Sequence, residues 1–411
     1  MKLTPKGMRD IPPEDMIIRE QVIEKIRNVY RKYGFRPIET PALEYLDTLK
    51  AKAGEEADKQ IFVIDGNEYG MRFDLTVPLA RYAASADTPK PFKRYAIDKV
   101  WRKEEPQRGR FREFWQADVD IIGSKSMRCE AEALTIAREI CFEFGFKKPK
   151  ILINNRKILD GVAAKLGFEE QKPTVFRILD KLDKIGAEEV KKLLEELLGA
   201  AKAKELVSLI NTKGDNKKKL EVAKKYSEEG ARELEEIVAF CTFEVTIDLS
   251  LVRGLGYYTG PVFEVKLAED MGSVAGGGRY DNLLGVYGQP AEATGISIGI
   301  ERLMTLMLEK EKGKSKTYSK VFVACAKPEF YKNTIELAVE LRASGISVET
   351  DLNERNLRKQ FDYCNSLEIP YCIIIGQREV ESRQFTLRDM KSGKEEQLPL
   401  DELIKRIVND S

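Results

Sequence analysis

The stretch WRKEEPQRGRFREFWQADVD, Trp101–Asp120, decides the fold because it reads as two strands joined by a tight turn. Apolar and aromatic residues alternate with polar ones near both ends, and a Pro-Gln-Arg-Gly turn lies between them. Arginine side chains bind phosphate and carboxylate groups through paired hydrogen bonds. We therefore expect a hairpin that either holds a phosphate group or is an ordinary charged surface hairpin. Its arginines are Arg102, Arg108, Arg110 and Arg112.

Strand patterns continue on both sides of this hairpin. Residues 61–125 contain several short strand-like runs, and Phe243–Leu251 alternates apolar and polar residues without a break. Such alternation predicts a half-buried strand of an antiparallel sheet. Pro261–Leu267 continues the pattern after a glycine-containing turn.

Helical patterns surround the predicted sheet. Asp15–Tyr33 has amphipathic spacing, and residues 156–239 read as several helices inserted before the strands resume. The charged stretch 309–319 is the predicted linker. Residues 320–411 follow a strand–helix–strand–helix–strand order, which indicates a small α/β domain with a largely parallel sheet. We expect a catalytic domain over residues 1–319 and this second domain over residues 320–411.

The composition excludes several kinds of chemistry. The chain has 411 residues, a net charge of +1 and no histidine, so Ser-His-Asp sites and histidine metal ligands are ruled out. None of its six cysteines forms a Cys-x-x-Cys pair, and scattered cysteines suggest a reducing cytoplasm. No stretch approaches the roughly 20 apolar residues of a membrane span.

Three glycine-rich motifs follow the helical region. They are LVRGLGYYTGPVFEV at 251–265, AGGGRYDNLLG at 275–285 and GISIGIERLM at 295–304. Glycines let a backbone approach a ligand closely, but each motif alone fits an ordinary hairpin or a core strand equally well. The lysine of a P-loop and the spacing of a dinucleotide-binding fold are both missing. The combination, in this order, is far more specific than any one motif.

Taken together with MRFDLTVPLARY at 71–82, these motifs resemble the histidine-specific class II aminoacyl-tRNA synthetases, in that family's order. The sequence FDLTVPLARY is similar to the corresponding motif of archaeal and eukaryotic members. The resemblance implies an α+β catalytic domain, built on an antiparallel sheet of six or more strands flanked by helices. It also implies a C-terminal α/β anticodon-binding domain, and a homodimer formed through FRPIETPAL at 35–43.

The same resemblance implies an ATP site and a histidine site, with ATP and Mg²⁺ as expected reactants and the histidine tRNA as partner. Arg102, Arg253 and Arg302 match the residues that act in the reaction. The ATP residues would be Arg102, Glu104, Arg110, Phe114 and Arg302. The histidine residues would be Asp74, Thr76, Arg102, Gln116, Asp120, Arg253, Tyr257 and Tyr258. Arg110 also aligns with the rim of the amino-acid pocket.

Contacts with tRNA are expected at two places. Gln107 and Arg108, at the hairpin tip, are candidates to touch the end of the tRNA. The helical insertion could clamp the acceptor stem through basic side chains, although a solvated helix face explains them as well. Those side chains are Lys213, Lys217, Lys218 and Lys219.

The sequence departs from the family pattern at Gly256, where an aspartate is common, and at Trp115, where a smaller ring is common. An alternative interpretation is the synthetase-like regulatory subunit of histidine biosynthesis, which charges no tRNA. Such chains usually lack the C-terminal domain and have eroded ATP motifs. Arg102, Glu104, Arg302 and residues 320–411 are all present here.

Overall fold

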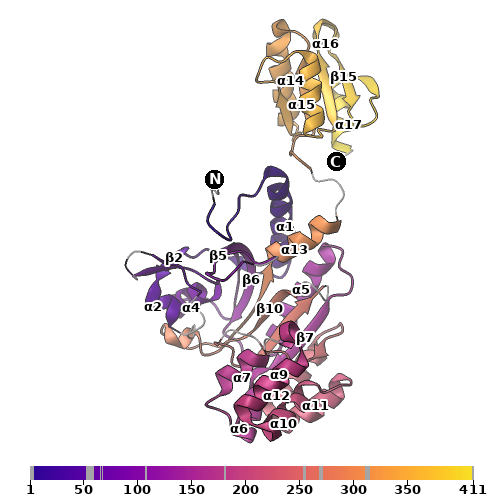
Figure 1. Cartoon of the computed structure of the whole chain (residues 1–411). Coiled ribbons are helices and arrows are strands. Elements are labelled where there is room, and N and C mark those ends of the chain that lie inside the picture. The colour runs from indigo at the N-terminus through magenta and orange to yellow at the C-terminus, as the bar shows by residue number, and fades with distance from the viewer. Residues whose placement is uncertain are drawn as a thin grey trace. The chain divides into compact units, whose positions relative to one another are not determined.

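The computed structural model (Figure 1) divides into two compact units, which are considered separately. The first unit comprises Met1–Asp10 and Val22–Lys310, and the second comprises Ile11–Gln21 and Glu311–Ser411. The boundary expected between residues 319 and 320 stays a prediction. The residues that the structure describes are 4–51, 60–64, 66, 68–106, 109–179, 182–252, 256–267, 272–310 and 315–409.

An eight-stranded sheet forms the centre of the first unit, in the order β1-β5-β6-β11-β10-β9-β7-β8. Its strand pairs are antiparallel except for β1 with β5 and β7 with β8, which confirms the predicted antiparallel architecture. The hairpin that opens the sequence argument is β5 and β6. The strands are β1 Arg36–Pro37, β5 Phe92–Trp101, β6 Glu113–Ile122, β7 Lys150–Asn155, β8 Thr246–Ile247, β9 Pro261–Lys266, β10 Ser273–Arg279 and β11 Ala293–Gly299.

Helices cover one face of this sheet. The helix α1 (Pro13–Lys32) reaches it through Tyr30, whose hydroxyl donates a hydrogen bond of 2.8 Å to the carbonyl of Ala117. The helix α5 (Arg128–Glu143) is held by an ion pair between Glu130 and Arg279 of β10. Successive side chains of a strand point to opposite faces. The side chains of β6 that point away from α1 therefore lie on the other face of the sheet, beside α4.

A helix that the sequence patterns did not predict, α4 (Thr76–Ser85), lies beside the sheet. The Asp74 carboxylate starts it by accepting hydrogen bonds from the backbone N–H groups of Thr76 and Val77, at 3.2 and 2.9 Å. Proline in the first turn of a helix loses no backbone hydrogen bond, so Pro78 is tolerated there. A three-stranded sheet and a short helix adjoin α4: β2 Leu43–Tyr45, β4 Tyr69–Met71, β3 Val63–Ile64 and α2 Leu46–Lys50.

The inserted segment is helical, as predicted. Its helices are α6 Arg156–Leu166, α7 Lys172–Leu179, α8 Leu182–Ile185, α9 Ala187–Leu198, α10 Ala200–Ile210, α11 Asn216–Lys224 and α12 Glu228–Phe240.

The long antiparallel strand predicted over Phe243–Leu251 is wrong. Only Thr246–Ile247 forms a strand, β8, and it pairs parallel with β7 at the edge of the sheet. The alternation itself is real, because Val245, Ile247 and Leu249 are buried. Apolar alternation reports which side chains are buried, but ladder hydrogen bonds require a partner strand along the whole length.

The second unit contains a five-stranded sheet in the order β13-β12-β14-β15-β16. The parallel pairing of β12 with β13 and β14 confirms the predicted α/β order. Two antiparallel strands, β15 and β16, were not predicted. The elements are β12 Val321–Cys325, η2 Pro328–Phe330, α14 Tyr331–Ala343, β13 Val348–Thr350, α15 Leu357–Ser366, β14 Tyr371–Ile375, α16 Gln377–Ser382, β15 Gln384–Asp389, β16 Glu395–Pro399 and α17 Leu400–Asn409.

The remaining elements of the first unit are η1 (Leu284–Val286) and α13 (Ile300–Lys310). The first two residues of the predicted linker, Glu309 and Lys310, thus end a helix. None of the helices in the described part of the chain is long and apolar enough to cross a membrane.

Candidate active site

Three polar side chains lie on the face of β6 that is opposite to α1. Gln116, Asp118 and Asp120 are two residues apart, so they point to the same side of the sheet, and all three are buried. The register with β11 sets them opposite Gly299, Ser297 and Gly295. In the ladder, Gln116 pairs with Gly299, Asp118 with Ser297, and Asp120 with Gly295.

Glycine is required beside Asp120. A Cβ atom at Gly295 would lie 2.0 Å from Oδ1 of Asp120, and one at Gly278 of β10 would lie 2.8 Å from the Tyr258 ring. The small residues of β10 and β11 therefore make room for the carboxylate and the ring. This is the physical reason for two of the glycine motifs seen in the sequence.

Arg102 leaves the end of β5 toward this face. Its Nε donates a hydrogen bond of 2.9 Å to the carbonyl of Phe73, and its Nη2 lies 3.4 Å from Oε1 of Gln116. The guanidinium lies 5.1 Å from the centroid of the Phe114 ring. The structure therefore brings together Arg102, Phe114 and Gln116, which the sequence assigned to the ATP and histidine sites.

Asp74 lies next to this cluster, just before α4. Besides capping the helix, it lies 3.4 Å from the hydroxyl of Tyr257, which donates to it. Burial raises the pKa of Asp74, whereas the Val77 N–H and the Arg102 charge lower it. Thr76 is the first residue of α4, and its backbone N–H already donates a hydrogen bond to the Asp74 carboxylate.

Asp120 is held by two residues that the sequence did not single out. Nη2 of the fully buried Arg94 lies 2.6 Å from Oδ2 of Asp120, and the Tyr280 hydroxyl donates a hydrogen bond to Oδ1. Burial raises the pKa of Asp120, while Arg94 and Tyr280 lower it. Tyr280 belongs to a motif already quoted, but no local signal marks Arg94.

The two tyrosines of the RGLGYYTG motif form one wall of the site. The ring centroids of Tyr257 and Tyr258 are 5.0 Å apart, and those of Tyr257 and Tyr280 are 5.9 Å apart. All three are buried, and the pKa values of Tyr257 and Tyr280 are raised well above the usual value, mainly by burial. Their hydroxyls are therefore neutral hydrogen-bonding groups at neutral pH.

Arg302 lies in the first turn of α13, directly after β11. Its Nη1 donates a hydrogen bond to the carbonyl of Ser273, whose hydroxyl donates in turn to Glu264 of β9. The register that sets Gly299 beside Gln116 places the start of α13 next to the cluster around Arg102.

Among the remaining predicted residues, Arg110 and Glu104 fall in the described part of the chain. Gln107, Arg108 and Arg253 lie outside the described residues. Arg110 is exposed, and Glu104 is half-buried with its carbonyl accepting a hydrogen bond of 2.9 Å from Nε of Arg112.

The two departures from the family pattern have a local description. Gly256 is exposed, and a Cβ atom there would have no neighbour within 4 Å. The presence of glycine where aspartate is common therefore relieves no crowding. Trp115 is half-buried on the opposite face of β6 from Gln116, because adjacent side chains alternate.

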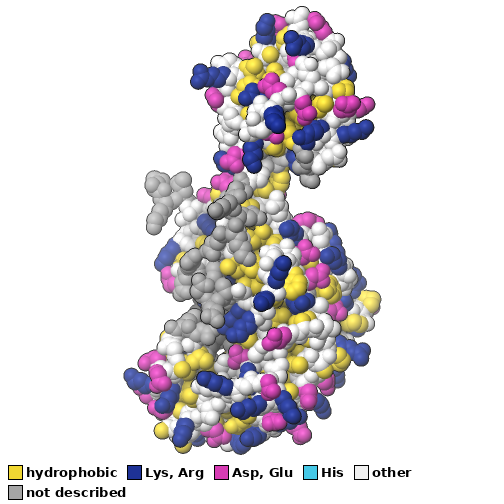
Figure 2. All heavy atoms as spheres, turned by 90° about the vertical axis from the view of Figure 1, so that its right-hand side faces the viewer, with side chains coloured by type: hydrophobic (Ala, Val, Ile, Leu, Met, Phe, Trp, Pro, Cys, Tyr) yellow, Lys and Arg dark blue, Asp and Glu magenta, His cyan; other side chains and the backbone are white. Residues whose placement is uncertain are grey.

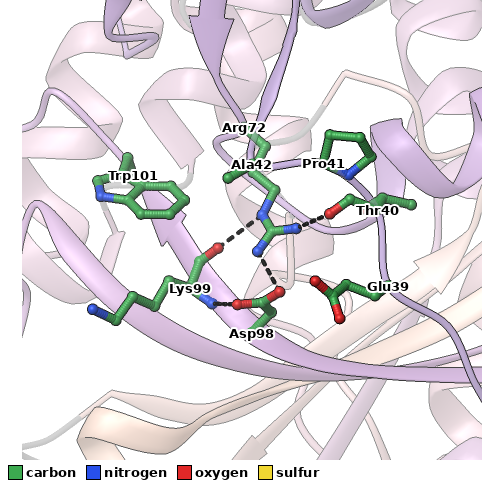
Figure 3. A pocket seen from close by; sticks show the side chains of 8 residues that line it. All are labelled: Glu39, Thr40, Pro41, Ala42, Arg72, Asp98, Lys99 and Trp101. Atoms are coloured by element: carbon green, nitrogen blue, oxygen red, sulfur yellow. Dashed lines mark hydrogen bonds and ion pairs between the residues drawn. The ribbon is translucent and has the colours of Figure 1, made fainter.

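A hollow of about 480 Å³ lies near the end of β5 (Figure 3) and contains none of the predicted ligand-binding residues. The buried Arg72 anchors it: the guanidinium bonds to the carbonyls of Thr40 and Lys99, at 2.6 and 2.9 Å, and pairs with Asp98 at 2.6 Å. Arg72 thus ties the FRPIETPAL segment to β5. This contact helps to position the strand from which Arg102 extends.

Comparisons with known proteins agree with this architecture. The family described as "Histidyl-tRNA synthetase" matches residues 7–303, and "Anticodon binding domain" matches residues 320–410. A histidine–tRNA ligase of Aeropyrum pernix is 41% identical, covering 98% of this chain and 97% of that protein. One from Korarchaeum cryptofilum is 40% identical, covering 94% and 95% of the two chains.

Solved structures show the same likeness. A histidyl-tRNA synthetase from Nostoc sp. PCC 7120 has a TM-score of 0.87 and 31% identity, and each chain covers 100% of the other. The sheet and the added anticodon-binding domain are those of a class II aminoacyl-tRNA synthetase. More narrowly, the chain belongs to the histidyl-tRNA synthetase family.

Proposed function

We propose that this chain is a histidine–tRNA ligase, which activates histidine with ATP and transfers it to the 3′ end of its tRNA. Membership of the family gives the general class of reaction. The observation that carries the proposal is the buried polar row on β6, flanked by Arg102 at one end and by a tyrosine wall at the other. A nucleotide and an amino acid would lie end to end along this row.

The first step needs positioning and charge stabilisation. The histidine carboxylate is already ionised at neutral pH, so it attacks the α-phosphorus of ATP in line and pyrophosphate leaves, without a general base. Arg102 and Arg253 would bind the carboxylate and the α-phosphate and stabilise charge on the phosphoryl oxygens. This chemistry suits a chain that contains no histidine. In the second step the terminal ribose hydroxyl of the tRNA attacks the adenylate carbonyl.

Each predicted ATP-binding residue would contact a different part of the nucleotide. Phe114 would stack on the adenine, and Glu104 would meet its amino group. Arg102 already lies close to the Phe114 ring, which supports an aromatic and cationic contact at this end of the row. Arg110 and Arg302 would bind the outer phosphates.

We assign Mg²⁺ to the ATP substrate itself. The described residues contain no group of three or more carboxylates or cysteines that could hold a metal ion. Phosphate oxygens are preferred ligands of Mg²⁺, which commonly binds proteins through one or two carboxylates and the substrate phosphates.

Histidine would be selected by hydrogen bonds. Gln116, Asp120 and Tyr258, all buried, would hydrogen-bond the imidazole ring, and Asp74 and Thr76, at the start of α4, would complete the pocket. A pocket built from buried polar groups rejects analogues that leave those groups unpaired, by about 10⁴-fold in well-studied cases.

A homodimer is proposed from the small sheet that follows FRPIETPAL. Leu43 and Tyr45 of β2 and Ile64 of β3 are 43%, 60% and 41% exposed. The ladder register, Tyr45 with Tyr69 and Ile64 with Tyr69, sets Tyr45 and Ile64 on one side of this sheet. Exposed apolar surface of this kind marks interaction sites. Replacing Tyr45 with Lys should lower the mass measured by light scattering from dimer to monomer.

Binding of the histidine tRNA is proposed for the anticodon-binding domain and for the helical insertion. Figure 2 shows basic and acidic side chains interspersed over the lower part of the molecule, where the insertion lies. Lys213, Lys217 and Lys218 are exposed, but Lys219 donates a hydrogen bond of 2.7 Å to the carbonyl of Ile247. Lys219 therefore has a structural role, and the other three remain the candidates for phosphate contacts.

The domain limits, 1–319 and 320–411, and a cytoplasmic location complete the proposal. All six cysteines are unpaired, which is usual in a reducing compartment.

Histidine-dependent exchange of pyrophosphate into ATP, followed by charging of histidine tRNA, tests the proposal. The wild-type protein should perform both reactions, whereas Arg253→Ala should lose adenylate formation by orders of magnitude. Near-normal exchange in that variant would remove Arg253 from the mechanism. Histidine binding without exchange in the wild type would favour the regulatory-subunit alternative. A structure described as an ATP phosphoribosyltransferase regulatory subunit/histidyl-tRNA synthetase from Bacillus halodurans C matches less well, with a TM-score of 0.73 and 25% identity.

A further inference from the structure

Asp118 is a buried carboxylate that the proposed reaction has not yet used. It lies on β6 between Gln116 and Asp120, and strand alternation directs it to the same face as both. Its side chain is nearly inaccessible, with the residue 2% exposed. It is therefore part of the same polar row as two residues assigned to histidine.

One oxygen of Asp118 lacks a partner. Oδ1 accepts no hydrogen bond from any described residue, although the carboxylate is fully enclosed. Ser297 donates to Asp118, and Oγ of Ser297 itself accepts a hydrogen bond of 2.5 Å from Nε2 of Gln116. Buried polar atoms are almost always paired, so an unpaired acceptor between two residues proposed to bind histidine points to a donor that arrives with the ligand.

The charges around Asp118 favour a positively charged donor. The groups that act on it are Arg94 of β5, Asp120 of β6, Ser297 of β11 and Asp74 before α4. Arg94 is engaged by Asp120, at 2.6 Å. Asp118 in turn raises the pKa of the Tyr30 hydroxyl on the helix-covered side, after the larger effect of burial. Asp118 and Asp120 thus share one buried arginine, while the charge that acts on Asp74 is that of Arg102. Around Asp118 itself, two carboxylates therefore face one guanidinium.

The pKa of Asp118 agrees with this description. Burial raises it to about 7, Arg94 lowers it, and Asp120 raises it further. A cation that reached Oδ1 would favour the ionised carboxylate and offset part of the effect of burial.

We propose that Asp118 is a further binding residue of the amino-acid pocket, which accepts a hydrogen bond through Oδ1 from the α-ammonium group of the bound amino acid. The inference rests on the proposed histidine-binding role of this face. The α-ammonium group is the one permanent cation of histidine at neutral pH, whereas its ring is largely neutral. Asp74 is close enough to act on the charge of Asp118, so the two carboxylates together would attract that cation.

Three ligands separate this contact from other effects of Asp118. Histidine has both the ammonium group and the carboxylate, histidinol keeps the ammonium group, and imidazolepropionate keeps the carboxylate but lacks the ammonium group. Binding of each would be measured by calorimetry with the full-length protein and with Asp118→Asn. The matched control is Asp87→Asn, which makes the same chemical change at an exposed position of the same unit.

The expected result is selective. Asp118→Asn should weaken histidine and histidinol about 10- to 100-fold, the range for a lost hydrogen bond to a charged group, and leave imidazolepropionate within about twofold. The KM for ATP should stay unchanged, and Asp87→Asn should behave as wild type.

Two results would overturn the inference. Equal weakening of all three ligands would place Asp118 at the ring or in the framework of the pocket, and unchanged binding of histidinol would remove it from the ammonium site. Wild-type pyrophosphate exchange, run in parallel, tests the proposed function separately. A wild-type protein that charges histidine tRNA, together with an Asp118→Asn variant that binds histidinol normally, would refute only this inference.

Discussion

Burial of Asp118 should make the first unit less stable at high pH, and Asp118→Asn should relieve this effect. The folded-state pKa of Asp118 is raised from 3.8 to about 7. Because the folded state holds the proton more tightly than the unfolded state, the free energy of unfolding falls as pH rises between these two values and is level above about 7. A difference of about 3 pKa units corresponds to roughly 4 kcal/mol at its full extent.

The neutral amide of asparagine avoids this loss while keeping the size of the side chain. The gain in unfolding free energy from Asp118→Asn should therefore be roughly 4 kcal/mol at pH 8. It should shrink to roughly 2 kcal/mol at pH 5, where only about 1 unit separates the pH from the unfolded pKa. Burial of the asparagine amide without hydrogen-bond partners offsets part of this gain at every pH. The test therefore compares the gain in unfolding free energy at pH 8 with the gain at pH 5.

Urea unfolding followed by tryptophan fluorescence measures this difference. The chain has two tryptophans, Trp101 and Trp115, and both lie in the first unit, so the signal reports that unit alone. Protein concentration must be held fixed, because a dimer links stability to concentration. Asp87→Asn serves as the control and should change little at either pH. A variant that is less stable than wild type at pH 8, or whose gain is the same at pH 5 and pH 8, would refute the reasoning.

Three further predictions concern other parts of the first unit. Gly295→Ala should lower both stability and pyrophosphate exchange, because its Cβ would lie 2.0 Å from Oδ1 of Asp120; normal exchange would show that β11 can shift. Glu130→Gln should destabilise the first unit by about 1–3 kcal/mol in urea unfolding, since it removes a buried ion pair with Arg279, which keeps only Asp281 as an acidic partner; an unchanged free energy of unfolding would contradict this. Arg302→Ala should raise the KM for ATP about 10- to 100-fold with little change in the KM for histidine, measured by pyrophosphate exchange; an equal effect on both substrates would point to the lost contact with Ser273 instead.

Much of both units could be predicted from local sequence patterns. The β5–β6 hairpin, the helical insertion and the parallel strands of the second unit follow from apolar periodicity and from turn residues. The helix α4 could not be found in this way, because it depends on the Asp74 side chain as a cap and carries a proline in its first turn. The strand predicted over Phe243–Leu251 failed for a related reason, since its alternation gave burial without a partner strand.

The site was recognised from motifs, and the structure gathers part of it. Arg102, Phe114, Gln116, Asp74 and Tyr257 lie around one face of the sheet. Their roles toward ATP and histidine stay predictions. Asp118 could have been noticed, because the spacing of Gln116, Asp118 and Asp120 by two residues is visible in the sequence.

By itself, the sequence determined which face each strand residue takes and where close backbone approach is needed, because strand period and glycine are local properties. Only the tertiary structure decided the partners of Asp120: Arg94 on the neighbouring strand, and Tyr280, which is 160 residues away. It also decided that Asp118 is enclosed with one oxygen unpaired. Burial, and with it the pKa of a carboxylate, is set by segments that meet only after folding, so no local pattern can encode it.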